Sequence, residues 1–77
     1  MLSFVNFLLT LKDDDSAMGD LARDASVDDR ISKRWGFNKF MDHITISGAC
    51  QGARLTACAC LLLYNDYKGR NMYETIL

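Results

Sequence analysis

The chain has 77 residues, of which 49% are hydrophobic and 25% are charged, and its formal net charge is −1 at pH 7. This length allows one domain with a small core, and the composition is neither that of a disordered chain nor that of a disulfide-dense scaffold. The near-neutral charge gives no overall attraction to nucleic acid or to acidic lipid, so any such binding would need a local patch.

The first half of the chain predicts two helices. The first helix begins near Phe4, where apolar residues follow the i, i+3, i+4, i+7 spacing of one helix face. These residues are Phe4, Phe7, Leu8 and Leu11. Asp15 or Ser16 is the expected N-cap of a second helix over residues 18–25. Small residues there, including Gly19, allow a neighbouring backbone to approach closely, although Gly19 costs about 1 kcal/mol relative to Ala in a helix.

The second half predicts two more helices after an irregular segment. Residues 27–36 are expected to form a turn or a short helix, and residues 37–44 show helical spacing again, with Gly48 as the natural stop. The last long helix is expected over residues 50–67. From Ala53 onward it is apolar on nearly every side, which is typical of a helix that is central to a bundle or covered by a partner.

The chain is therefore expected to be an all-α, small four- to five-helix bundle. We expect one helical domain over residues 1–67 and a C-terminal tail over 68–77, with Gly69 as the helix end. The apolar tail residues could fold back on the domain or dock on a neighbour; they are Met72, Tyr73, Ile76 and Leu77. The predicted core comprises Phe4, Phe7, Leu8, Leu21, Phe40, Ile44, Leu61 and Tyr64. Replacing Phe7 with Ala is expected to cost about 3 to 5 kcal/mol.

Several short motifs occur in a characteristic order. They are Ser3-Phe4 with Phe7-Leu8, Asp15-Ser16 with Gly19-Asp20-Leu21-Ala22 and Asp24-Ala25, Gly48-Ala49-Cys50, and Ala53 and Tyr67. This arrangement resembles the YozE family of small bacterial domains, whose fold is similar to a sterile alpha motif. The resemblance covers roughly residues 3 to 67 and implies four or five helices. The chain departs from the family at Phe37 and Tyr64, where tryptophan is frequent, and lacks the usual Phe-Pro-Lys turn. Because the family's function is largely unknown, the resemblance carries over no catalytic residue.

No set of residues in the sequence predicts a catalytic, cofactor or metal site. Cys58 and Cys60 are two positions apart, so they diverge on a helix, and no paired ligand motif accompanies them. Free cysteines are commonly buried as small hydrophobes, and Cys50, beside a helix start, is the best of three poor candidates for a reactive thiol. His43 is expected on the polar side of its helix, at the surface. We therefore expect a protein that is not an enzyme and binds no cofactor.

One stretch could bind a partner, because four basic residues alternate there with aromatic ones. The candidate interaction patch comprises Arg30, Lys33, Arg34, Trp35 and Lys39. Such a patch can contact phosphates while an aromatic ring stacks on a base, but without a positive domain it is more often a solvated rim.

Three functions are compatible with this sequence. The favoured one is a non-enzymatic helical interaction module that binds another protein or its own copy. The first alternative is a small nucleic-acid-binding protein, and the second is a phage or mobile-element inhibitor or accessory protein of a host enzyme. The odd number of cysteines, placed in or beside one apolar segment, and the absence of a basic segment before the first apolar run predict a cytoplasmic protein, with no membrane partner.

Overall fold

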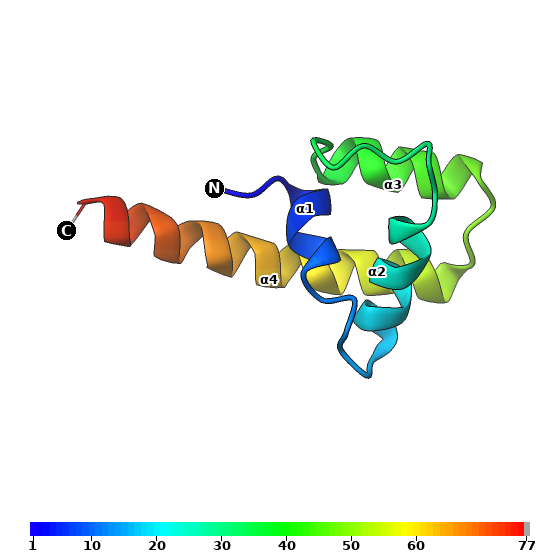
Figure 1. The fold of residues 1–77 in the computed structure, drawn as a ribbon, viewed down its shortest axis with the longest axis horizontal. Helices are drawn as coiled ribbons and strands as arrows, with labels where there is room; N and C mark the ends of the chain where they lie inside the picture. Colours follow the sequence, from blue (N-terminus) through cyan, green and yellow to red (C-terminus); the bar gives the residue numbers. More distant parts are fainter. Residues whose placement is uncertain (77) are drawn as a thin grey trace.

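The computed structural model describes the backbone of residues 1–76 and the side chains of residues 1–70. Four helices form within this part of the chain: α1 (Phe4–Leu9), α2 (Ala17–Ser26), α3 (Phe37–Ile46) and α4 (Gln51–Ile76). The predicted all-α bundle is confirmed. In Figure 1, α4 lies along one side of the molecule and extends well beyond the three shorter helices.

The two N-terminal helices begin at serine caps. The Oγ of Ser3 accepts a hydrogen bond from the backbone N–H of Asn6 at 3.1 Å, and the Oγ of Ser16 accepts one from Gly19 at 3.3 Å. Each bond satisfies a backbone donor that has no partner inside the helix. Of the two predicted caps of α2, Ser16 is therefore the one used.

A small residue in the first turn of α2 allows a neighbouring backbone segment to approach closely, as the sequence predicts. A Cβ atom added at Gly19 would lie only 1.8 Å from the carbonyl oxygen of Asp14. The loop between α1 and α2 thus passes so close to the first turn of α2 that glycine is required there.

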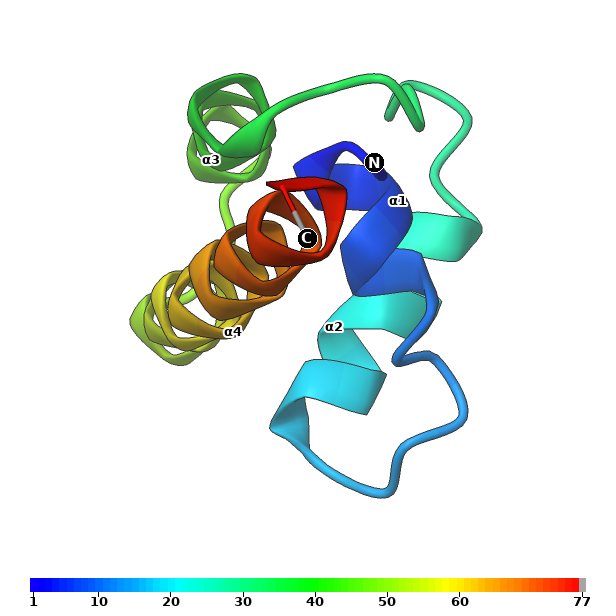
Figure 2. The same ribbon diagram turned by 90° about the vertical axis from the view of Figure 1, so that its left-hand side faces the viewer.

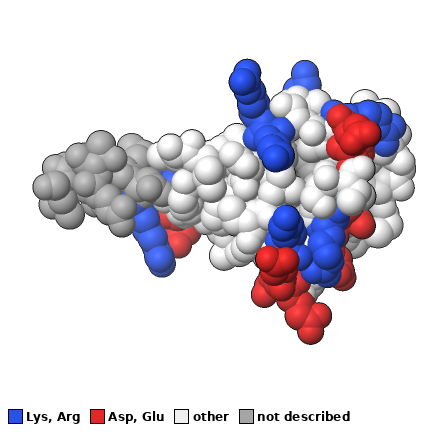
Figure 3. Space-filling view, in the orientation of Figure 1, with Lys and Arg blue, Asp and Glu red and all other residues white. Residues whose placement is uncertain are grey.

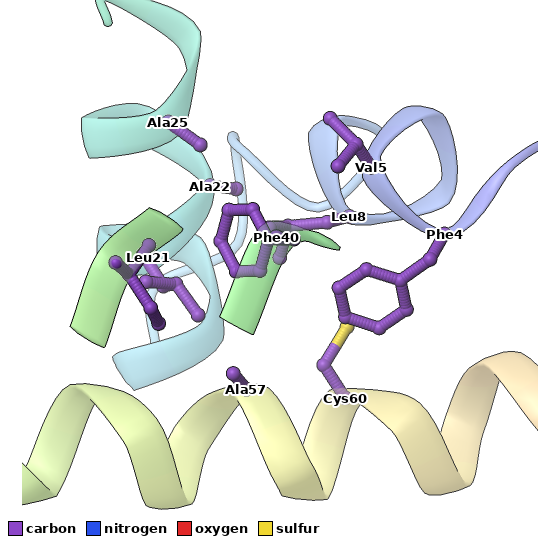
Figure 4. Close-up of a cluster of buried hydrophobic side chains, with 10 residues drawn as sticks. Phe4, Val5, Leu8, Leu21, Ala22, Ala25, Phe40, Ala57 and Cys60 are labelled. Carbon is purple, nitrogen blue, oxygen red and sulfur yellow. The ribbon is translucent and has the colours of Figure 1, made fainter. Parts of the chain in front are cut away.

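The core lies where the three shorter helices meet α4. Its buried residues are Phe4, Val5, Leu8, Leu21, Ala22, Ala25, Phe40, Ile44, Ala57 and Cys60, and nine of them are labelled in Figure 4. Five of the eight predicted core residues are among them: Phe4, Leu8, Leu21, Phe40 and Ile44. The other three, Phe7, Leu61 and Tyr64, are half-buried and pack against this core.

The N-terminus is attached to the middle of α4 through two tyrosines. The hydroxyl of Tyr64 donates to the carbonyl oxygen of Leu2 at 2.7 Å, and the backbone N–H of Leu2 donates to the hydroxyl of Tyr67 at 3.0 Å. Phe7 packs on both tyrosine rings, with centroid distances of 5.5 and 5.1 Å. This aromatic cluster fixes α1 against α4.

Three predicted boundaries differ from the structure. Helix α1 ends at Leu9, two residues before the expected Leu11, and turns follow it. Helix α3 continues to Ile46 before Gly48, whose φ of +90° ends the helical path. Helix α4 does not end at Gly69 but continues to Ile76. The predicted contacts of the tail residues Met72, Tyr73, Ile76 and Leu77 lie outside the described side chains.

The three shorter helices are arranged on one side of α4. Each of them contacts α4, and Figure 2 shows α3 above it and α1 and α2 beside it, with the opposite side of α4 open. Apolar residues on α4 can therefore be covered by the bundle on one side only.

Candidate functional site

The predicted interaction patch lies on the loop between α2 and α3 and on the first turn of α3. This loop forms turns, which were one of the two predicted alternatives for residues 27–36. The backbone N–H of Ile31 donates to the carbonyl oxygen of Asp28, and that of Trp35 donates to Ser32. Figure 3 shows lysine and arginine side chains at several places on one face of the molecule, with acidic side chains beside those at its upper right and along its lower edge.

Arg30 is held by Asp28 within the same turn. Its Nε lies 3.1 Å from Oδ1 of Asp28, and its Nη2 lies 3.3 Å from Oδ2. Asp28 also contacts Nε2 of His43 at 3.0 Å, which links the loop to α3. Arg30 and then His43 hold the pKa of the Asp28 carboxyl well below its ordinary value, because both favour its charged form. Arg30 is therefore engaged in the fold.

His43 is not the surface residue that the sequence predicts. Its side chain is only 16% exposed, and its ring lies 5.4 Å from that of Trp35. The helix periodicity placed His43 on the polar side of α3, but the loop of residues 27–36 returns over this side and covers it. A long-range hydrogen bond between Asp28 and His43 could not be found from spacing alone.

Trp35 and Lys39 also contact each other. The Nζ atom of Lys39 lies 5.6 Å from the centroid of the Trp35 ring, within cation–π range, and Trp35 is half-buried against the core. The aromatic ring is therefore not free to stack on a base without losing this contact.

Lys33, Arg34 and Lys39 are exposed and have no acidic partner among the described residues, and of these three Lys39 contacts the Trp35 ring. Lys33 lines a cavity of about 370 Å³ together with Lys12, a residue far away in the sequence. Asn6, Thr10 and Ser26 contribute to the same wall. The hydroxyls of Thr10 and Ser26 donate to carbonyl oxygens of their own helices, so the two lysines supply the charge of this cavity.

The three cysteines have different environments. Cys60 is fully buried beneath the bundle, and burial raises its thiol pKa to about 11. Cys50 and Cys58 are exposed. The expectation that the cysteines are buried as small hydrophobes is wrong for Cys58, because its side of α4 faces away from the other helices.

Among the described residues, few side chains that could ligate a metal or act as a nucleophile lie near one another. No group of three or more His, Cys, Asp or Glu side chains in this part of the chain could hold a metal ion. Cys50 and His43 line one open cavity of about 310 Å³, but no hydrogen bond joins them, and Nε2 of His43 is bound to Asp28. A cysteine nucleophile would need a base within hydrogen-bond distance.

Comparison with known protein families, with curated proteins and with solved structures finds no match for this chain. The resemblance to the YozE family therefore remains a prediction that rests on the motifs quoted above. Within the described residues, no helix combines the length and the apolar character needed to cross a bilayer.

Proposed function

We propose that this chain is a small, non-enzymatic helical interaction module that binds another protein or a second copy of itself through the outer face of α4. The observation that carries this proposal is a row of exposed apolar side chains in the middle of that helix. Leu55 is 61% exposed, Leu62 is 72% exposed and Leu63 is 46% exposed, and the exposed Cys58 lies between them in the sequence.

The helix geometry explains how α4 can be apolar on two sides. Ala57, Cys60 and Tyr64 follow the i, i+3, i+7 spacing and face the bundle, where the first two are fully buried. Leu55 and Leu62, also seven residues apart, fall on the opposite side. The bundle covers the first face and leaves the second in water.

A continuous apolar face exposed by a small protein is typical of an interaction surface. Covering it with a partner would also support a helix of 26 residues whose C-terminal part extends beyond the bundle in Figure 1. The patch around Lys33 and Arg34 supports a nucleic-acid partner less well, because Arg30, Trp35 and Lys39 are already engaged within the fold.

Light scattering on the full-length chain, from micromolar to hundreds of micromolar, measures self-association, and affinity capture followed by mass spectrometry identifies a heterologous partner. The variant Leu62→Glu places a charge on the outer face of α4. Ile46→Glu is the matched control, because Ile46 is an apolar residue at the end of α3 that is even more exposed than Leu62.

We expect the parent and Ile46→Glu proteins to form the same dimer or complex and Leu62→Glu to lose it, with unchanged helical circular dichroism. A parent protein that stays monomeric at all concentrations and captures no protein would overturn the proposal. An association that persists unchanged in Leu62→Glu would also overturn it.

A further inference from the structure

A groove runs along α2 on the side that faces α3 and the start of α4. Three adjoining cavities form it, of about 280, 310 and 90 Å³. Leu21 and Asp24 line all three cavities, so the cavities are neighbours along α2. We refer to this feature as the α2 groove; it is separate from the outer face of α4.

The rim of the α2 groove is acidic. Asp20, Asp24 and Asp28 follow one another at intervals of four residues, which places them in a row about 6 Å apart along the helix and its end. Asp20 lines the first cavity, and Asp28 lines the other two. No described Lys or Arg lines any of the three cavities, and the basic group among the lining residues is His43.

Of these three acids, Asp24 is the one available to bind a cationic group. Asp20 pairs with Arg23, and Asp28 binds Arg30 and His43. Asp24 is exposed, and its carboxylate has no ion pair or hydrogen bond with a described residue. A cationic group that enters the groove therefore meets the Asp24 carboxylate in the middle of the acidic row, where no described side chain neutralises its charge.

The floor beneath this rim is apolar. Leu21 and Ile44 are nearly buried and form the floor with the half-buried Ala53 of α4. A surface with an apolar floor and an acidic edge suits a lysine or arginine side chain, whose hydrocarbon stem can lie on the floor while its charged end reaches the carboxylate. The same edge would repel the phosphates of a nucleic acid.

We propose that the α2 groove binds a basic, amphipathic peptide segment of a partner protein. Apolar side chains of that segment lie on Leu21 and Ala53, and its lysine or arginine side chains pair with Asp24 and with the outer oxygens of Asp20. This is the helix-in-groove form of peptide recognition, with charge complementarity along one edge. The inference does not depend on the outer face of α4, because none of Leu55, Leu62 and Leu63 lines the groove.

The test uses the full chain, labelled with ¹⁵N, and two synthetic amphipathic peptides as probes. One peptide combines leucine with lysine, and the other has the same leucine pattern with glutamate in place of lysine. We expect the lysine peptide to shift the amide signals of Leu21, Asp24 and Ala53 with saturation, and to bind more weakly as salt is added. The glutamate peptide should leave these signals unchanged.

The variant Asp24→Asn should weaken binding of the lysine peptide about two- to fivefold, the range of an exposed ion pair. Asp13→Asn is the matched control, because it makes the same charge change at an exposed loop residue outside the groove, and it should bind like the parent. Leu62→Glu should also keep full binding, which separates this test from that of the proposed function.

Three results would overturn the inference. They are equal binding by the two peptides, unchanged affinity in Asp24→Asn, and signal shifts that concentrate at Leu55 and Leu62. Because the Asp24 side chain is exposed and unpaired, its replacement is expected to leave the melting temperature unchanged. The contrast between the two peptides on the parent protein remains decisive if the variant is unstable.

Discussion

Phe4 is the side chain whose loss should damage this fold most. It is fully buried, and its ring contacts those of Phe37, Phe40 and Tyr64 at centroid distances of 5.2, 5.7 and 5.6 Å. In Figure 4 the ring points from α1 to Cys60 on α4, so it joins the first helix to the last. Removing it would leave a cavity that three helices surround.

We expect Phe4→Ala to lower the free energy of unfolding by about 3 to 5 kcal/mol, the usual range for a buried phenylalanine. The loss of aromatic pairs, each worth about 0.5 to 1.5 kcal/mol, favours the upper end. A chain of this size has a total stability of roughly 4 to 12 kcal/mol, so this loss takes from about a quarter to all of the free energy of unfolding. Phe4→Leu loses the same aromatic pairs but keeps most of the apolar volume, so it should leave a smaller cavity and cost less than Phe4→Ala.

Urea unfolding followed by far-UV circular dichroism measures these differences. Phe7→Ala is the informative comparison, because Phe7 is half-buried and rests on Tyr64 and Tyr67 at the edge of the core. Its cost should be only about 2 kcal/mol, less than the value that the sequence alone suggests. A Phe4→Ala protein as stable as the parent, or one more stable than Phe7→Ala, would refute this account of the core.

Three further predictions concern single positions. Gly19→Ala should destabilise the protein by about 1 to 3 kcal/mol despite the better helix propensity of alanine, because its Cβ would clash with a backbone oxygen. Gly52→Ala, where the nearest atom is 3.8 Å away, should not lower the melting temperature; equal effects at the two sites would contradict the packing. A thiol reagent at mildly alkaline pH should modify Cys58 rapidly and Cys60 slowly, since burial raises the Cys60 pKa to about 11; equal rates would show that Cys60 is accessible. The depressed pKa of Asp28 makes its contribution to stability complete above the ordinary pKa of 3.8 and progressively lost as the pH falls below it. Asp28→Asn should therefore flatten the acid-unfolding curve in this range, and a curve identical to that of the parent would show that the ion pairs of Asp28 do not stabilise the fold.

The local pattern of the sequence was sufficient to predict the helices and much of the core. The spacing of Phe4 with Leu8 and of Phe40 with Ile44 is helical, and each pair is buried as expected. Gly48 ends a helix because its positive φ is accessible to glycine at little cost. These features depend on residues close together in the chain, which periodicity and turn chemistry describe well.

The end of α4 could not be predicted in the same way. A single glycine inside a helix costs only about 1 kcal/mol, so Gly69 is a weak reason for a helix to stop. The helix continues to Ile76 in the structure. The apolar character of α4 on all sides left two alternatives open, a central helix or a partner surface. The positions of the other three helices were needed to show that the bundle covers only one side of α4.

Other features depended on contacts between distant segments. Val5 was not on the predicted apolar face of α1, yet it is fully buried, because the loop before α3 also packs on this helix and its Trp35 carbonyl accepts the Val5 backbone N–H at 3.2 Å. The pairing of Asp28 with His43 and the α2 groove likewise join residues from different elements. The sequence by itself determined which segments are helical and which faces are apolar, since these follow from neighbours within one or two turns. Only the tertiary structure decided which apolar faces stay exposed and which acids share a groove, because the packing of helices far apart in the chain sets both.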